Sequence, residues 1–365
     1  MLVVTAIGIE GLLQAFYYLT AGDFLFRRGV LPLFEPDPTR CFRLKSELAY
    51  SHRTNEFDVT VFTNSQGHRT DQRRLEVPHA KPPGAYRILF LGPSLTFGWG
   101  NEFEEAYPTL LGEALRASGA PVEVLNLGTP AQQPSAQLCW LRAEGYRFEP
   151  DAIVQTIYGD RIPPVAATCP EELQCPAVVE GKLYNALPTL RLELISWARN
   201  LASVFYGYYL FQTLRPGGDA PEGTGKELYG EAEREGDLAP SELAEQYRSF
   251  GEFAARVTGR ATPVVFLYIP LSYAVHPSDA PRWRHILNPD PEATRQRIRT
   301  GLAALRDAGI TVIDTTGPLI EAAHRERMYY WLDIHLTPAG NRVVSEAALP
   351  RLTALLAARA GPDQL

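Results

Sequence analysis

The stretch RILFLGPSLTFGWG, residues 87–100, joins an apolar run to a glycine-rich turn. Its first half is continuously apolar after Arg87, which is typical of a strand buried on both faces of a parallel sheet. Gly92 and Pro93 then end the strand. We therefore expect Ser94 just beyond the carboxyl edge, where open parallel sheets bind ligands, although serine is also a common turn residue.

Further short runs of apolar and β-branched residues follow the first one. They lie at 122–127, 152–157, 263–269 and 310–314. Helix-like segments separate most of these runs, and a last one follows them; they lie at 104–118, 133–146, 240–259, 291–308 and 338–359. Strands that alternate with helices predict a parallel sheet covered on both faces, which is a three-layer α/β domain.

This main domain is expected over residues 85–361, after two smaller segments. Residues 1–30 form an apolar amino-terminal segment, and residues 31–84 form a small β-rich preface with one alternating run, FDVTVFT, at 57–63. An insertion at about 161–240 is too long for a simple crossover between strands. Its apolar stretch and the Gly- and Glu-rich run after it favour either a lid over a substrate cleft, or a packed helical excursion or oligomer contact.

Composition and charge limit the function classes. The chain has 365 residues, of which 45% are hydrophobic and 21% charged, so it can bury a full core. A formal net charge of −7 without a basic run argues against a nucleic-acid partner. The four cysteines are too few for a disulfide scaffold. Cys169 and Cys175 are close enough in sequence to form a bridge in an oxidising compartment, or are two free thiols in a loop.

Residues 2–20 are mostly apolar over about the length of a membrane span, but they include Glu10 and Gln14. The segment lacks the basic start and the cleavage site of a secretory signal. It is expected to be a membrane anchor or an interfacial helix, the alternative being a helix packed on a soluble domain. The expected location is the cell envelope, membrane-anchored or periplasmic. Because Arg27 and Arg28 follow the segment, a cytoplasmic location is the alternative.

A nucleophilic serine needs a base, and the base needs a carboxylate that orients it. The segment YWLDIHLTP, residues 330–338, offers both side chains. Thr337 can cap a helix that has Pro338 at its first position, which places Asp333 and His335 in the loop before it. A lone histidine is more often structural, but an Asp-x-His at this place predicts a triad with Ser94.

Two familiar motifs do not fit the opening stretch. Thr96 stands where the α/β-hydrolase motif G-x-S-x-G has its second glycine. The spacing of Gly92, Gly98 and Gly100 matches neither of the glycine-rich loops that bind phosphates.

Three blocks of the chain together resemble the SGNH (GDSL-like) hydrolases. LGPSLTFGWG is similar to the family's first block, G-D-S-[LYF]-T-x-G, with Ser94 at the position of the nucleophile. VLNLGTPAQ, residues 124–132, is similar to the second block, and LDIHLTPAGN, residues 332–341, to the last block. TNSQGHRT, residues 63–70, is also like the N-S-x-G-x-R preface of membrane-anchored bacterial members.

The resemblance covers about residues 60–360 and implies a flavodoxin-like α/β/α fold with a five-stranded parallel sheet. It implies Ser94, Asp333 and His335 as catalytic residues, with no metal and no organic cofactor. It also implies an oxyanion hole formed by the backbone N–H groups of Ser94 and Gly128, together with the residue at position 159.

The chain departs from the family at two positions. Pro93 replaces an aspartate of the first block, which should change only the local geometry. Gly159 occupies the position of the asparagine in the third block, whose side chain donates to the oxyanion. Losing one such donor costs about 2.7–4 kcal/mol. The backbone of Gly159, the side chain of Gln155 or Gln132, or a water molecule replaces it, or the protein is a slow or degenerate member.

Three functions are compatible with these features. The first is an esterase or deacylase acting on a small-molecule or carbohydrate ester, with O-acetyl groups of envelope carbohydrate as an expected substrate. The second is an O-acyltransferase that acts on a polysaccharide with the same triad. The third is a binding or assembly protein that has kept the fold without the catalysis.

Overall fold

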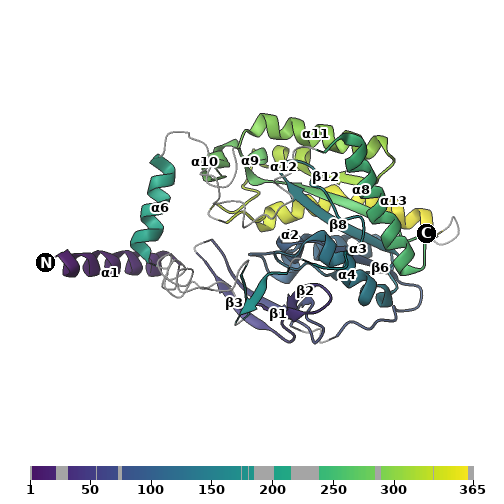
Figure 1. Cartoon of the computed structure of the whole chain (residues 1–365), viewed down its shortest axis with the longest axis horizontal. Coiled ribbons are helices and arrows are strands. Elements are labelled where there is room, and N and C mark those ends of the chain that lie inside the picture. The colour runs from purple at the N-terminus through teal and green to yellow at the C-terminus, as the bar shows by residue number, and fades with distance from the viewer. Residues whose placement is uncertain are drawn as a thin grey trace.

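The structure is a computed structural model, which describes residues 2–21, 32–54, 56–72, 76–173, 175–179, 181–184, 201–214, 238–283, 289–331 and 333–360. A five-stranded sheet lies at the centre of the molecule, with helices on both of its faces (Figure 1). Its strands are β6 (Tyr86–Leu91), β7 (Val122–Asn126), β8 (Ala152–Gly159), β11 (Val264–Pro270) and β12 (Val312–Asp314).

The sheet is entirely parallel, in the order β12-β11-β8-β6-β7. The predicted fold class and strands are therefore confirmed, and the strand ends differ from the prediction by one or two residues. The chain moves from β6 to the edge strand β7, and then crosses to β8 on the other side of β6. This reversal lies at the carboxyl end of β6, which is where doubly wound sheets bind their ligands.

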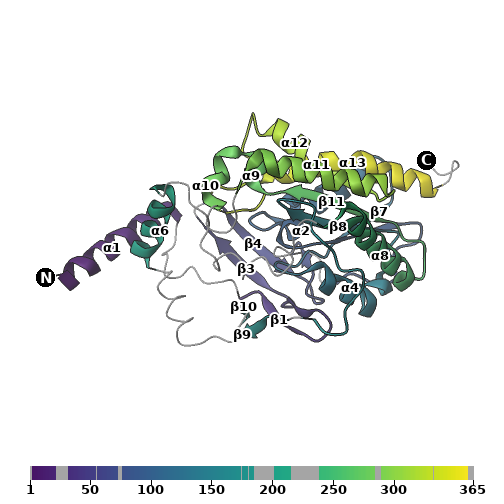
Figure 2. The same ribbon diagram turned by 45° about the horizontal axis from the view of Figure 1, so that its top comes forward.

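Alternating residues along the strands form a separate core on each face of the sheet. On one face, Leu89 and Leu91 pack with residues of α4, α8 and α11. On the other face, Ile88 and Phe90 pack with residues of α3, α12 and α13. Figure 2 shows these two helical layers on either side of the strands. Because both faces are covered, the strands are apolar throughout, as the opening stretch indicated.

The helices are listed here with their bounds. The long helices are α3 (Tyr107–Ala117), α4 (Pro134–Ala143), α8 (Pro240–Thr258), α11 (Pro291–Asp307), α12 (Thr316–Ala322) and α13 (Pro338–Ala360). The short ones are α2 (Ser94–Phe97), η2 (Phe103–Glu105), η3 (Gly145–Phe148), α9 (Ser272–Val275), η5 (Pro277–Asp279) and α10 (Ala280–Trp283).

The segment before the main sheet is rich in antiparallel strands. β1 (Phe34–Asp37) and β2 (Cys41–Leu44) form one hairpin. β3 (Ala49–Arg53), β4 (Asp58–Thr63) and β5 (Arg69–Thr70) form a three-stranded sheet. A short pair within the insertion, β9 (Ala177–Val179) and β10 (Lys182–Tyr184), completes the antiparallel strands of the described chain.

The pairing of the cysteines differs from both expectations. Cys139 is bonded to Cys169, with 4.7 Å between their Cα atoms, and Cys41 is bonded to Cys175, with 5.1 Å. The predicted bridge between Cys169 and Cys175 is therefore wrong, and neither residue is a free thiol. Cys169 is buried in the core beside Cys139 of α4, whereas Cys175 lies against strand β2. The two bridges thus fasten the insertion separately to the main domain and to the preface.

Helix α1 (Leu2–Ala21) packs against α6 (Ala202–Leu214) at one end of the molecule (Figures 1 and 2). Glu10 accepts hydrogen bonds from the backbone N–H groups of Ala202, at 2.6 Å, and Ser203, at 2.9 Å, and so caps the start of α6. Gln14 donates to Glu10 at 2.8 Å. The two polar residues of the apolar run therefore face the partner helix.

The described helices include none that is long and apolar enough to cross a bilayer. The expectation that residues 2–20 span a membrane is therefore not supported, which leaves the interfacial helix and the packed helix. Part of the insertion, including the Gly- and Glu-rich run at 216–236, lies outside the described residues, so the predicted lid lies there as well.

Candidate active site

The structure brings Ser94, His335 and Asp333 together although they lie 241 residues apart in the chain. Ser94 is the first residue of α2, directly after β6. Its Oγ lies 2.7 Å from Nε2 of His335, and Nδ1 of His335 is hydrogen-bonded to Oδ1 of Asp333. This sequence of hydroxyl, imidazole and carboxylate is the arrangement that activates a nucleophilic serine.

The loop that carries Asp333 and His335 ends where the sequence predicts. Helix α13 begins at Pro338, and Oγ1 of Thr337 accepts a hydrogen bond from the backbone N–H of Gly340 at 3.2 Å. Burial raises the pKa of Asp333, but the charge of His335 and the hydrogen bonds from its backbone and ring outweigh burial and hold this pKa below its usual value. Asp333 is therefore an anion that can stabilise a protonated His335.

Trp99 is a site residue that the sequence did not single out, although it lies within the opening stretch. Its indole Nε1 donates to Oδ2 of Asp333 at 3.3 Å, and its ring centroid lies 5.5 Å from that of His335. Asp333 thus accepts hydrogen bonds on both carboxylate oxygens, which fixes its rotation. A tryptophan seven residues after a turn carries no sequence signal for such a role.

The arginine of the N-S-x-G-x-R preface supports the helix that carries the serine. Arg69 is only 3% exposed and donates to the carbonyl oxygens of Phe97, at 3.1 Å, and Asn101, at 2.8 Å. Its guanidinium also lies 4.4 Å from the centroid of the Phe97 ring. Burial lowers the pKa of Arg69 to about 10, so it stays charged at neutral pH. Arg69 therefore satisfies carbonyls at the end of α2, which a helix of one turn leaves open.

Two predicted oxyanion donors lie beside each other at the ends of β6 and β7. The N–H of Ser94 opens α2, and Gly128 packs so closely on this helix that an added Cβ would lie 2.2 Å from the backbone nitrogen of Phe97. Position 128 therefore requires glycine. In this structure its N–H donates to Oδ1 of Asn126 at 3.0 Å, so it would have to share or exchange this acceptor to bind an oxyanion.

Gly159 lies at the end of β8, where an asparagine side chain does not fit easily. Its φ is 158°, and an added Cβ would lie 3.0 Å from the carbonyl oxygen of Arg161. The carbonyl of Gly159 accepts a hydrogen bond from the hydroxyl of Tyr268 at 2.7 Å, which holds this backbone conformation. The missing carboxamide is therefore matched by a backbone shaped for glycine.

Neither glutamine considered as its replacement is free to donate. Nε2 of Gln132 donates to the carbonyl oxygens of Arg40, at 3.5 Å, and Phe42, at 3.1 Å. Nε2 of Gln155 donates to Oε1 of Gln137 at 2.8 Å and to the carbonyl oxygen of Thr156 at 3.1 Å. Both amides have spent their N–H groups in buried surroundings, so the suggestion that they serve the oxyanion is wrong. The backbone N–H of Gly159 and a water molecule are the candidates that remain.

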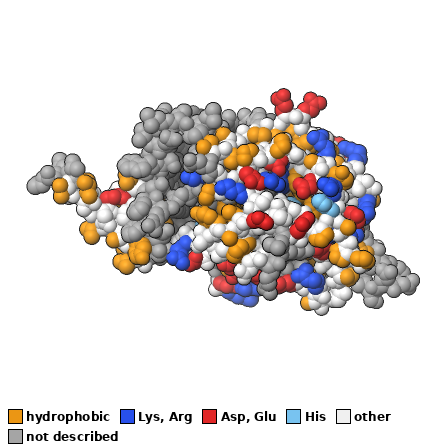
Figure 3. Space-filling view, turned by 90° about the horizontal axis from the view of Figure 1, so that it is seen from below, with side chains coloured by type: hydrophobic (Ala, Val, Ile, Leu, Met, Phe, Trp, Pro, Cys, Tyr) orange, Lys and Arg blue, Asp and Glu red, His pale blue; other side chains and the backbone are white. Residues whose placement is uncertain are grey.

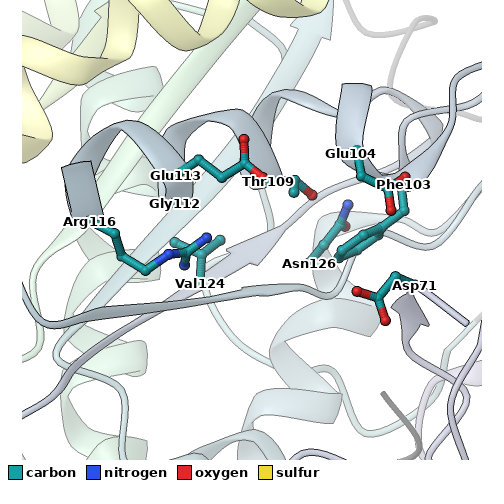
Figure 4. Close-up of a pocket in the computed structure, with 9 residues that line it drawn as sticks. All are labelled: Asp71, Phe103, Glu104, Thr109, Gly112, Glu113, Arg116, Val124 and Asn126. Carbon is teal, nitrogen blue, oxygen red and sulfur yellow. The ribbon is translucent and has the colours of Figure 1, made fainter. Parts of the chain in front are cut away.

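A cavity of about 380 Å³ lies between helix α3 and strand β7 (Figure 4). It is lined by Asp71, Phe103, Glu104, Thr109, Gly112, Glu113, Arg116, Val124 and Asn126. Ser94 and His335 are not among these residues, so the cavity is not where an acyl group would meet the serine. The described part of the chain holds no group of three or more His, Cys, Asp or Glu side chains placed to bind a metal ion.

The fold and the site together define a flavodoxin-like α/β protein with a serine–histidine–aspartate chain at the carboxyl edge of its sheet. Residues 228–364 match the family model described as the SGNH hydrolase-like domain of the acetyltransferase AlgX. This match confirms the SGNH resemblance for the part of the chain that carries Asp333 and His335. No curated protein matches the chain.

Solved structures give weaker similarities. The chain is 14% identical to an α/β hydrolase, LAE5, from the metagenome of Lake Arreo, with 76% of this chain and 99% of that chain covered and a TM-score of 0.40. It is 15% identical to the M. smegmatis aryl esterase, with 74% and 99% covered and a TM-score of 0.39. For Axe2, an acetyl-xylooligosaccharide esterase from Geobacillus, the values are 13%, 73%, 94% and 0.40. Scores this low carry no argument, and the fold assignment rests on the order of the strands.

Proposed function

We propose that this protein is an esterase or deacylase that cleaves carboxylic esters with Ser94 as the nucleophile. The observation that supports this most is the hydrogen-bonded chain from Ser94 through His335 to Asp333, with 2.7 Å between Ser94 Oγ and His335 Nε2. The chain stands at the point of the sheet where such folds bind substrates.

The proposed reaction follows from this geometry. Oγ of Ser94 attacks the acyl carbonyl carbon while Nε2 of His335 takes the hydroxyl proton. The backbone N–H groups of Ser94, Gly128 and Gly159 are the proposed donors to the tetrahedral oxyanion. His335 then gives its proton to the leaving alcohol, and a water molecule repeats the steps on the acyl-enzyme. Asp333 holds the ring orientation and stabilises the imidazolium.

The acceptor of the acyl group decides between hydrolysis and transfer. Water as the acceptor makes the protein a deacylase, for which O-acetyl groups of a carbohydrate are the proposed substrate. A sugar hydroxyl as the acceptor makes it an O-acyltransferase, and the acetyltransferase named in the family match favours this second function. Both functions use the same covalent intermediate on Ser94.

Acyl partition is the measurement that tests the proposal. We expect p-nitrophenyl acetate to be turned over faster than longer-chain esters, with most of the acetate released to water when an oligosaccharide acceptor is also present. Acetylated oligosaccharide as the main product would establish the transferase instead. If neither product forms and a fluorophosphonate probe does not label Ser94, the protein is a binding or assembly protein with this fold.

For its location we propose the extracytoplasmic face of a membrane. Two disulfides, one of them between the preface and the insertion, are typical of oxidising compartments. Helix α1 exposes large apolar side chains, among them Val4 (74% exposed), Leu12 (74%) and Leu19 (81%). Figure 3 shows apolar side chains along this projecting end of the molecule. Since Glu10 is turned toward α6, the exposed side of α1 can lie in a lipid surface.

Replacing exposed leucines of α1 by glutamate tests this location. The double variant Leu12→Glu, Leu19→Glu should bind phospholipid vesicles at least about a hundredfold more weakly, because burying each leucine contributes about 1.5–3 kcal/mol. Co-sedimentation with vesicles measures the change. Tyr146→Glu, which alters a side chain that is 45% exposed on η3 of the main domain, is the matched control and should bind as the unaltered protein does. Equal binding of all three proteins would show that α1 does not contact lipid.

A further inference from the structure

The turn between strands β3 and β4 reaches the loop that carries the catalytic aspartate and histidine. Glu56, in this turn, accepts a hydrogen bond from the backbone N–H of Asp333 on Oε2 at 2.8 Å. Its other carboxylate oxygen, Oε1, accepts from the backbone N–H of Trp331. One side chain of the preface therefore holds two alternate backbone groups of a loop that is 277 residues away in the chain.

These contacts continue directly into the proposed triad. Glu56 holds the N–H of Asp333, and Oδ1 of Asp333 accepts from both the backbone N–H of His335, at 3.0 Å, and its ring Nδ1. Nε2 of His335 in turn faces Ser94. The loop is otherwise closed by the hydrogen bond from the N–H of Tyr330 to the carbonyl of His335, at 3.0 Å. Glu56 thus stands one bond outside the triad.

The same hairpin also supports the residue that binds the other oxygen of Asp333. The ring of His52, on β3, lies 4.8 Å from that of Trp99 and 4.7 Å from that of Phe57. Phe57 packs on Tyr330, with 5.1 Å between ring centroids. Since the indole of Trp99 donates to Oδ2 of Asp333, the hairpin acts on Asp333 from two sides.

From this arrangement we propose that Glu56 is a positioning residue, which sets the place of Asp333 and His335 relative to Ser94. The proposal rests on the function proposed above. A carboxylate suits this place because it can accept from two N–H groups at once, and hydrogen bonds to a charged acceptor are stronger than neutral ones. A glutamine has the same size but only one acceptor oxygen, so it can hold only one of the two groups.

The test compares Glu56→Gln and Glu56→Ala with a control on the same hairpin. We expect kcat for p-nitrophenyl acetate to fall about ten- to a hundredfold in Glu56→Gln and at least as far in Glu56→Ala, with KM nearly unchanged. The control is Asp58→Asn, which removes an exposed ion pair with Arg53 and should keep the original kcat. Thermal melting of each variant establishes that it is folded.

A second readout does not need turnover. The proton between His335 Nδ1 and Asp333 should give a far-downfield signal in the proton NMR spectrum, assigned by its absence in Asp333→Asn. We expect Glu56→Gln to shift or broaden this signal and Asp58→Asn to leave it unchanged.

The two readouts separate the failure of this proposal from the failure of the proposed function. If the unaltered protein shows no turnover that depends on Ser94, the proposed function fails, and the NMR signal alone decides the role of Glu56. If the unaltered protein is active, an unchanged kcat and signal in Glu56→Gln would refute the positioning role. An equal loss in Asp58→Asn would also refute it, because the effect would then belong to the hairpin as a whole.

Discussion

Ser94→Ala should lower kcat for ester hydrolysis by about 10⁶-fold, the loss expected when the nucleophile of a serine triad is removed. The attack by Oγ has no substitute, since the only partner that the structure gives this hydroxyl is His335. The fold should not change, because the substitution removes one atom at the start of α2 and adds none. Turnover of p-nitrophenyl acetate and labelling by a fluorophosphonate probe measure the loss.

Ser249→Ala is a suitable control for this experiment. Ser249 lies on α8, and its hydroxyl contacts Glu245 of the same helix at 3.5 Å. This variant should keep full activity and full labelling. Turnover that persists in Ser94→Ala at the level of the control would exclude the mechanism, whatever other residues contribute.

The fold could be predicted from the sequence because its information is local. Each strand of the parallel sheet is a short apolar run, and the turn after β6 is marked by Gly92 and Pro93. The order of strands and helices then restricts the topology to a doubly wound sheet. Strand ends were less certain, since the last one or two residues of a strand depend on pairing with a neighbour.

The three residues of the proposed triad could also be found, because each stands at a fixed place beside a predictable element. Ser94 follows a buried strand, and Asp333 and His335 precede a helix that is marked by Thr337 and Pro338. What could not be found are the contacts that join distant segments. Nothing in the sequence near Glu56 indicates that its carboxylate meets a loop close to the other end of the chain.

The cysteines illustrate the same limit. Six residues separate Cys169 from Cys175, and this proximity suggested a bridge between them. The chain instead turns Cys169 into the core beside α4 and leaves Cys175 beside β2. Likewise, Gln132 and Gln155 were plausible donors in sequence, but tertiary contacts had already engaged their amide groups.

The second large effect is expected at the carboxylate of the triad. Asp333→Asn should lower kcat by about 10⁴-fold, as the loss of the orienting carboxylate does in serine triads. In the unaltered protein, Oδ1 accepts from His335 and Oδ2 accepts from the indole of Trp99. An asparagine has only one acceptor oxygen for these two donors, so its NH₂ group must face one of them.

Each orientation of this amide has a cost. If the oxygen faces His335, the NH₂ group opposes the indole N–H of Trp99, and two donors meet. If the oxygen faces Trp99, the NH₂ group donates to Nδ1 of His335, which places the ring proton on Nε2. His335 can then no longer accept the proton of Ser94, and this is the reason for the large loss.

The structure therefore predicts a partial rescue by a second substitution. Trp99→Phe removes the indole donor, so the amide of Asp333→Asn can turn its oxygen toward His335 without opposing another N–H group. We expect the double variant to be about tenfold more active than Asp333→Asn alone, since removing one such conflict is equivalent to about one hydrogen bond. Trp99→Phe in the original background should lower kcat, because Oδ2 of Asp333 then loses a partner. Measured kcat values for the four proteins form a complete cycle, and additive losses would show that Trp99 and Asp333 act independently.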